Sequence, residues 1–176
     1  TDRLNRRILV VDDNQSIHDD FRSILQSETG LEAFELARSA LFGGSIPVPS
    51  HESFQVDCVD QGQAALTAME TARSEDRPYA VAFVDMRMPP GWDGLETIEH
   101  LWKADSRLQV VVCTAYSDQP WEEIRERIGR TDKLLILQKP FNGIEALQLA
   151  TALCWKWDLA NKAVGQLYEL SRLVEE

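Results

Sequence analysis

The chain has 176 residues, of which 44% are hydrophobic, and a net charge of −11, which fits one sizeable buried core with an appended segment. The acidic charge argues against a general nucleic-acid surface, because such a surface needs clustered Lys and Arg to neutralise phosphates. No apolar run approaches the ~18 residues of a membrane span and the charged start TDRLNRR lacks the core of a signal peptide, so neither nucleic-acid nor membrane contact is expected in this fragment.

Short apolar runs alternate with amphipathic stretches along the chain. The runs are mostly aliphatic or β-branched and are predicted to be strands at Ile8–Val11, Phe54–Val59, Ala80–Val84, Val110–Cys113 and Leu134–Leu137. Helical patterns cover Ser16–Gln26, Gly62–Ala72, Leu95–Ala104 and Trp121–Ile128, and a long final one runs from Gly143 towards Glu176. This alternation predicts an α/β fold with a parallel sheet and helices on both faces.

Polar side chains follow four of the predicted strands directly. Asp12 and Asp13 come after the first, Asp85 after the third, Thr114 after the fourth, and Lys139 shortly after the fifth. In parallel sheets, ligands bind beyond the carboxyl ends of the strands. The order of elements therefore brings these five residues to one edge of the sheet.

Three converging carboxylates repel one another unless a cation is present. Oxygen ligands with room for water suit Mg²⁺, so Mg²⁺ is the expected cofactor. A hydroxyl at Thr114 and an ammonium at Lys139 then offer a donor and a charge to a phosphoryl group. An aspartate in this company is a candidate phosphoryl acceptor.

Each residue also has a plainer interpretation when taken alone. Asp13 or Asn14 fits the N-cap of the following helix, and Asp85 fits an ordinary loop acid before a turn. Lys139 fits a solvated surface residue and Thr114 a hydroxyl at a strand end. The phosphoryl site is the wrong interpretation only if all of these plainer interpretations hold at the same time.

Taken together, these motifs resemble a response-regulator receiver domain of two-component signalling, over roughly Arg7 to Cys154. The resemblance is carried by the acid pair in VVDD, Asp85 in FVDMRMP, Thr114 in VVCTA and Lys139 in LQKPF. It implies a flavodoxin-like, doubly wound, five-stranded parallel sheet of order 2-1-3-4-5. Four motifs in the right order are far more specific than any one of them.

The resemblance also implies the function. Asp85 would accept a phosphoryl group from a histidine kinase or phosphotransfer domain, and Mg²⁺ would be bound by Asp12, Asp13, Asp85 and the backbone carbonyl of Arg87. The chain would then be a phosphorylation-switched signalling module and not an enzyme beyond its own phosphorylation and dephosphorylation. The alternatives are an aspartyl-phosphate phosphatase of haloacid-dehalogenase type, disfavoured because its acceptor lies at the first strand, and a non-phosphorylated interaction domain.

The resemblance assigns further roles near the acceptor. Lys139 would pair with phosphoryl oxygens, Thr114 would move towards them, and Lys139–Pro140 would be a cis peptide. Ile136 stands where many family members have an aromatic residue that turns inward on activation. Tyr116 is the nearby aromatic residue proposed as its substitute.

Other side chains carry less information. Cys58, Cys113 and Cys154 lack metal-ligand spacing and are interpreted as reduced, buried thiols, which favours the cytoplasm. His18, His51 and His100 are scattered and are expected to be surface or packing residues. The tryptophans at 92, 102 and 121 are expected to pack or to face partners.

The segment between the first helix and the second strand is unusually long for this family. We place the receiver domain at residues 1–154, with an insertion at about 28–53. Apolar residues from Leu31 to Phe42 repeat at helical spacing, so a small helix packed on the domain edge is expected, with a partner-binding subsite as the alternative.

The last helix is predicted to continue well beyond the domain. Residues 155–176 form a helical linker towards an output module expected to follow. An apolar 4-3 pattern runs along it, at Leu153, Trp157, Ala160, Val164, Leu167, Ser171 and Val174. A parallel homodimer through Ala160–Val174 is preferred over a helix that folds back on its own domain.

Overall fold

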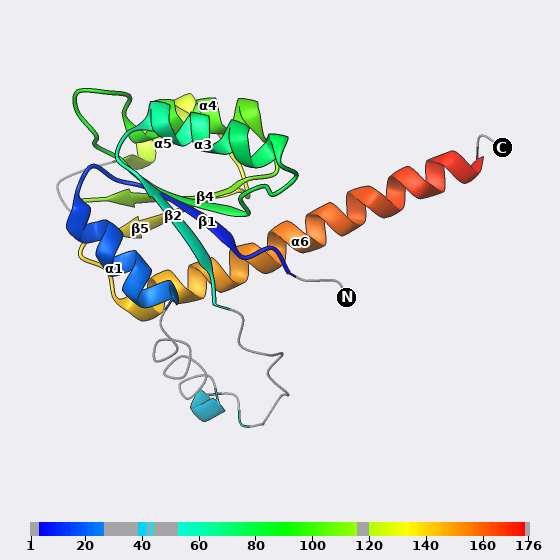
Figure 1. Ribbon diagram of the computed structural model, residues 1–176, viewed down its shortest axis with the longest axis horizontal. Helices are drawn as coiled ribbons and strands as arrows, with labels where there is room; N and C mark the ends of the chain where they lie inside the picture. Colours follow the sequence, from blue (N-terminus) through cyan, green and yellow to red (C-terminus); the bar gives the residue numbers. More distant parts are fainter. Residues whose placement is uncertain (1–3, 27–38, 42, 44–52, 116–119, 175–176) are drawn as a thin grey trace.

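The computed structural model describes residues 4–26, 39–41, 43, 53–115 and 120–174 (Figure 1). Its sheet has five parallel strands in the order β2-β1-β3-β4-β5. The strands are β1 (Arg7–Val11), β2 (Gln55–Val59), β3 (Val81–Asp85), β4 (Gln109–Thr114) and β5 (Leu134–Gln138). The predicted fold class and strand order are confirmed, and each strand boundary differs from its prediction by one residue at most.

The helices form a layer on each face of the sheet. They are α1 (Gln15–Gln26), α3 (Gly62–Ser74), α4 (Gly94–Ala104), α5 (Pro120–Arg127) and α6 (Gly143–Val174). Figure 1 shows α3, α4 and α5 on one face and α1 with the first part of α6 on the other. This is the doubly wound arrangement that βαβ crossovers produce.

Alternation along the strands divides the interior into two cores. In β1, Ile8 and Val10 pack with Phe21 of α1, whereas Leu9 and Val11 pack into the second core with α3 and α4. Successive strand side chains point to opposite faces, so a strand buried on both faces is continuously apolar. This explains why the central strands read as unbroken hydrophobic runs.

β5 lies at an edge of the sheet, and its burial is correspondingly incomplete. Leu135 is 40% exposed and Ile136 is 39% exposed. Ile136 thus occupies an open position on this edge. Tyr116, the proposed aromatic substitute, lies outside the described residues.

Most of the insertion also lies outside the described residues. The described part includes a helical stretch at 39–41, where Leu41 is 77% exposed. Neither the predicted packing of a helix from Leu31 to Phe42 nor the alternative partner-binding role is tested by these residues.

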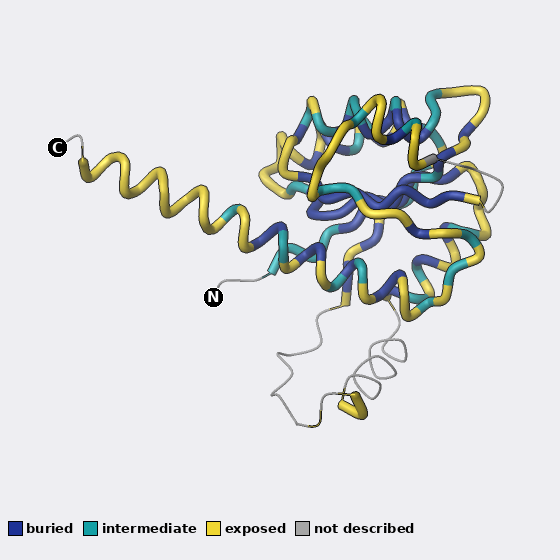
Figure 2. Tube along the Cα trace, turned by 180° about the vertical axis from the view of Figure 1, so that it is seen from behind, coloured by how far each residue is buried: buried dark blue, intermediate teal, exposed yellow. Residues whose placement is uncertain are grey.

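Helix α6 packs on the domain over its first half and then leaves it. Its buried residues end at Trp157 and Asp158. The Asp158 carboxylate accepts a hydrogen bond from the backbone N–H of Asn5 at 3.2 Å, and Arg107 donates to the Asn161 side chain at 3.2 Å. From residue 162 to 174 every residue is exposed (Figure 2). The helix therefore folds back on its own domain in one part and extends into solvent in the other.

The helix is continuous where the domain was predicted to end. Trp157 belongs to the hydrophobic core, three residues beyond the expected boundary at residue 154. The division into a domain and a linker therefore has no break in secondary structure to mark it, and it stays a prediction.

The three cysteines are free, as predicted from their spacing. Cys113 and Cys154 are buried, and burial raises the pKa of each thiol to about 12. Cys58 is only half-buried, because it lies on the edge strand β2. Within the described residues, no helix combines the length and the apolar character needed to cross a membrane.

The end of α3 depends on one residue in an unusual backbone conformation. Asp76 has φ 54°, in the left-handed region. Its N–H donates to the Arg73 carbonyl at 3.1 Å, and the N–H of Arg77 donates to the Ala72 carbonyl at 2.8 Å. These two bonds form a Schellman motif, in which the position of Asp76 is usually glycine.

We predict that Asp76→Gly is more stable than Asp76→Ala by about 1 kcal/mol, because a Cβ in the left-handed region costs roughly that much. Both variants remove the same carboxylate, so their comparison isolates the backbone effect. Urea unfolding followed by circular dichroism measures the difference. Equal midpoints for the two variants would contradict this account of the turn.

Candidate functional site

The parallel sheet brings the predicted site residues to the carboxyl ends of its strands. Asp12 and Asp13 follow β1, Asp85 is the last residue of β3, Thr114 is the last residue of β4, and Lys139 follows β5. Asp85 is paired with Cys113 in the register of β3 and β4. The topology thus assembles residues that are more than 100 positions apart in the chain.

The three carboxylates and the lysine form one cluster. Oxygen atoms of Asp12, Asp13 and Asp85 lie within 4.8 Å of one another. The ammonium nitrogen of Lys139 is 2.7 Å from an Asp12 oxygen and 3.2 Å from an Asp85 oxygen. One lysine therefore bridges two of the three acids.

Burial and charge act together on this cluster. Burial and the neighbouring charge of Asp12 raise the pKa of Asp85 above its ordinary value, although Lys139 and the backbone N–H of Arg87 partly offset them. Burial alone would lower the pKa of Lys139, but its hydrogen bond to Asp12 and the charges of both acids raise it. Lys139 therefore stays protonated, and Asp85 is held in an environment that disfavours its charged form.

The donor set fits a small hard cation. The cluster has three carboxyl groups and one ammonium, so acidic groups outnumber basic ones by two. Asp13 is exposed and Asp12 is buried, so the group opens towards solvent on one side. Carboxylate oxygens that are accessible to water are the ligands that Mg²⁺ prefers. Arg87 lies two residues after Asp85, which keeps its carbonyl a candidate ligand.

The capping interpretation of the first acidic pair applies to Asn14. Its side-chain oxygen accepts a hydrogen bond from the N–H of Ser16 at 3.0 Å, at the start of α1. Asp12 in turn accepts from the N–H of Asn14 at 2.8 Å. Because Asn14 caps the helix, Asp13 is not needed for this purpose.

Backbone hydrogen bonds fix the ends of β3, β4 and β5 relative to one another. The N–H of Met86 donates to the Cys113 carbonyl at 3.0 Å, and the N–H of Lys139 donates to the Thr114 carbonyl at 2.7 Å. Thr114 is only 3% exposed. The Lys139–Pro140 peptide is cis, as the resemblance implied. The acceptor strand and the lysine loop are thus both attached to β4.

His18, which was expected to be a surface or packing residue, is buried and packs beside the site. It is 2% exposed, and its Nε2 lies 2.6 Å from the backbone carbonyl of Asp12. With the proton on Nε2 the ring donates this bond and so positions the backbone of Asp12. The signal in the sequence was its spacing from Phe21 and Leu25, which share the buried face of α1.

The loop after β3 ends at Gly94, the first residue of α4, which packs closely against the end of β3. A Cβ there would lie 2.5 Å from the Asp85 carbonyl oxygen, so only glycine allows α4 to begin this close to β3. Asp93 caps α4 by accepting from the N–H of Glu96 at 2.8 Å. Trp92 stacks on His100 with ring centroids 3.9 Å apart, which makes both of them packing residues.

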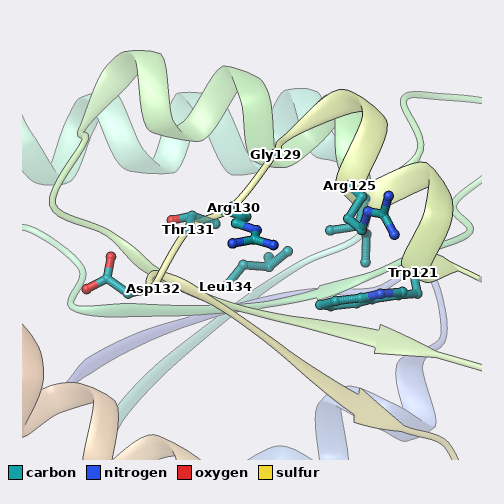
Figure 3. A pocket seen from close by; sticks show the side chains of 8 residues that line it. Trp121, Arg125, Gly129, Arg130, Thr131, Asp132 and Leu134 are labelled. Atoms are coloured by element: carbon teal, nitrogen blue, oxygen red, sulfur yellow. The ribbon is translucent and has the colours of Figure 1, made fainter.

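A separate pocket of about 860 Å³ lies between α5 and β5 (Figure 3). It is lined by Trp121 and Arg125 from α5 and by Leu134 from β5, and Trp121 is 61% exposed. None of the clustered carboxylates lines it. This pocket is therefore distinct from the cluster at the strand ends.

The sequence profile of the response regulator receiver domain matches residues 48–151. The chain is also 33% identical, over 122 residues, to the transcriptional regulatory protein TctD of Salmonella typhimurium; this match covers 69% of the chain and 48% of TctD. The chain thus spans about half the length of the curated relative. The profile match begins at residue 48, within the insertion, so it includes Asp85, Thr114 and Lys139 but not Asp12 or Asp13.

Solved structures share the fold at lower identity. A response regulator receiver protein from Sinorhizobium medicae superposes with a TM-score of 0.59 at 18% identity, covering 86% of this chain and 95% of that one. A CheY-like receiver domain protein from Methanospirillum hungatei gives 0.61 at 19%, covering 88% and 98%. An adenylate cyclase structure from Rhodopirellula baltica gives 0.67 at 22%, covering 94% and 98%.

The profile match covers more than half of the chain, and solved receiver domains superpose on its fold. The chain therefore belongs to the response regulator receiver domain family.

Proposed function

We propose that Asp85 accepts a phosphoryl group from a histidine kinase or a phosphotransfer protein, and that the chain is a switch and not an enzyme acting on other substrates. The observation that carries this proposal is Lys139, which lies within 3.2 Å of both Asp12 and Asp85. A cation fixed beside one carboxylate of an acidic cluster is suited to the oxygens of an incoming phosphoryl group.

The proposed reaction assigns a role to each side chain at the strand ends. A carboxylate oxygen of Asp85 attacks phosphorus, the bond between phosphorus and the donor histidine nitrogen breaks, and an acyl phosphate forms on Asp85. Lys139 exchanges part of its contact with Asp85 for a phosphoryl oxygen, and the Thr114 hydroxyl donates to another. Asp12, Asp13, Asp85 and the Arg87 carbonyl would hold Mg²⁺, which supplies positive charge beside the transferring oxygens.

Two alternatives are weaker on specific grounds. A phosphatase of haloacid-dehalogenase type would have its nucleophile after the first strand, in a DxDx[TV] motif, whereas the sequence here is VVDDNQS. A non-phosphorylated interaction domain would not need an acid, a lysine and a hydroxyl at the ends of three different strands. We therefore favour the phosphoryl switch, in a cytoplasmic protein with free thiols.

The exposed part of α6 is the proposed route of output. Its large apolar side chains are between 58% and 86% exposed; they are Leu159, Val164, Leu167, Tyr168, Leu170, Leu173 and Val174. At 100° per residue, the centre of this apolar face follows Ala160, Ala163, Leu167, Leu170 and Val174, which have alternating three- and four-residue spacing. We assign this stripe to a parallel two-stranded contact with a second copy of the chain.

This seam differs by register from the one expected from the sequence. Both patterns contain Ala160, Leu167 and Val174. The pattern expected from the sequence also contained Val164 and Ser171, and in the seam proposed here their places are taken by Ala163 and Leu170. Leu153 and Trp157, which the earlier pattern also included, are buried in the domain core. The contact therefore starts only after α6 has left the domain.

Replacing the acceptor tests the central step. Asp85→Asn should abolish labelling by acetyl phosphate with Mg²⁺, because the amide keeps the shape of the side chain but loses its nucleophilicity. Phosphate-affinity electrophoresis or intact mass measures the labelling. Asp60→Asn, which changes an exposed acid after β2, is the matched control and should label normally. Full labelling of Asp85→Asn would rule out this acceptor.

The metal assignment is tested at Asp13. Asp13→Ala should weaken Mg²⁺ binding by on the order of tenfold or more, because a direct carboxylate ligand is lost. It should leave the apo protein at least as stable, because carboxylate repulsion is relieved. Calorimetric titration measures the affinity, with Glu70→Ala on α3 as a control. The same Mg²⁺ affinity in Asp13→Ala and in the unaltered chain would disprove the ligand role.

The seam is tested with paired charges. Leu167→Asp with Leu170→Asp places carboxylates at the centre of the proposed contact, so the double variant should be monomeric at concentrations where the unaltered chain associates. Light scattering over a concentration series measures the mass. Arg172→Asp, on the opposite face of the same helix and with the same change of −2 in net charge, should leave association unaltered. If the Leu167/Leu170 double variant associates at the same concentration as the unaltered chain, the interface lies elsewhere.

A further inference from the structure

Helix α5 is attached to the domain by few of its own side chains. Among residues 121–127 only Ile124 is buried, at 2% exposed, whereas Trp121 is 61% exposed. The neighbouring helix α4 buries residues along its whole length, from Gly94 to Leu101. An element that buries little apolar surface is free to move at low cost. The position of α5 therefore depends strongly on its polar contacts.

The last residue of α5, Arg127, makes those contacts. Its Nε and Nη2 lie 3.3 and 3.4 Å from the two carboxylate oxygens of Glu99 on α4, and its Nη1 lies 3.3 Å from an oxygen of Asp93. Glu123, one turn earlier on α5, is 3.6 Å from the same Nη1. An isolated exposed ion pair contributes little, but a planar fork that binds two carboxylates at once fixes orientation as well as distance. Arg127 thus joins α5 to α4 and to the residue that precedes α4.

Asp93 connects this network to the end of β3. Its carboxylate also caps α4, by accepting from the N–H of Glu96 at 2.8 Å. The next residue, Gly94, donates its N–H to the Met86 carbonyl at 2.9 Å, and Met86 directly follows Asp85. A short series of direct contacts therefore runs from the backbone at Asp85 to the guanidinium on α5.

We infer that Arg127 is a positioning residue that carries the phosphorylation state of Asp85 to α5. This inference rests on the proposed function for its input. An acyl phosphate adds negative charge and oxygen atoms at the end of β3, so the loop from Met86 to Gly94 has to accommodate them. Because Arg127 binds Asp93 directly, a displacement of Asp93 is passed to α5, which tilts about its buried residue Ile124.

The pocket between α5 and β5 is where this movement has its effect (Figure 3). Trp121 and Arg125 line it from α5, and Leu134 lines it from β5. The register of β4 and β5 holds β5 in the sheet, so α5 is the wall that moves. The width of this pocket and the surroundings of Trp121 therefore depend on the state of Asp85.

The indole N–H resonance of Trp121 in ¹⁵N-labelled protein reports the position of α5, and it is assigned by its loss in Trp121→Phe. In the unphosphorylated chain, Arg127→Gln should shift this resonance, because the amide loses both the charge and the fork that binds two carboxylates. Lys103→Gln, at an exposed position of α4, removes an equal charge and is the matched control. It should leave the resonance unchanged.

Phosphorylation tests the transfer itself. Acetyl phosphate with Mg²⁺ should shift the Trp121 resonance of the unaltered chain, with intact mass of the same sample giving the extent of labelling. Arg127→Gln should be labelled to the same extent but should lose most of this shift, whereas Lys103→Gln should retain it. A residue that only stabilised the fold would disturb the indole resonances of the other tryptophans as well.

Three results would overturn the inference. They are an unshifted Trp121 resonance in unphosphorylated Arg127→Gln, an unshifted resonance in the labelled, unaltered chain, and the same phosphorylation-dependent shift in Arg127→Gln as in the unaltered chain. Absence of labelling in the unaltered chain would instead refute the proposed phosphoryl acceptor. The comparison of the unphosphorylated variants would still decide whether Arg127 positions α5.

Discussion

The ammonium of Lys139 between Asp12 and Asp85 is the interaction on which the site depends. It joins residues at the ends of β1, β3 and β5, and it is the charge that allows two acids to remain this close. Backbone hydrogen bonds hold the same residues in place, because carbonyl groups of β4 accept from the N–H of Met86, after Asp85, and from the N–H of Lys139. The His18 ring, on α1, forms a hydrogen bond with the backbone carbonyl of Asp12. The chemistry therefore rests on several elements that must all be folded first.

The exit of α6 is fixed by a second polar cluster at the far side of the domain. Asp105 accepts two side-chain hydrogen bonds from Arg107, at 2.9 and 2.8 Å. Burial acts to raise the pKa of Asp105, but the hydrogen bonds from Arg107 outweigh it, so the pKa lies below its ordinary value. The same guanidinium lies 5.3 Å from the centre of the Trp157 ring and donates to Asn161. These contacts define where the packed half of the helix ends.

The two ends of the sheet thus differ in their charged residues. Carboxylates gather where the strands end, and arginines gather where they begin. The α6 helix is attached near the arginine end, at Trp157, whereas the proposed acceptor lies at the other. Under the proposed function, a signal from Asp85 would have to cross the domain to reach the exposed half of α6. The hydrophobic cores on the two faces of the sheet lie between them.

Local patterns determined the secondary structure and the location of the site. Apolar runs of four to six residues identified the strands, and parallel topology then required Asp12, Asp85, Thr114 and Lys139 to share one edge. No such rule applied to contacts between side chains. The burial of His18, the stacking of Trp92 on His100 and the division of α6 at Asp158 depend on which surfaces meet when the layers pack. Sequence alone determined the elements and the edge where they converge, because these follow from periodicity and strand direction; only the tertiary structure decided which polar groups became partners, because partners are set by packing between distant segments.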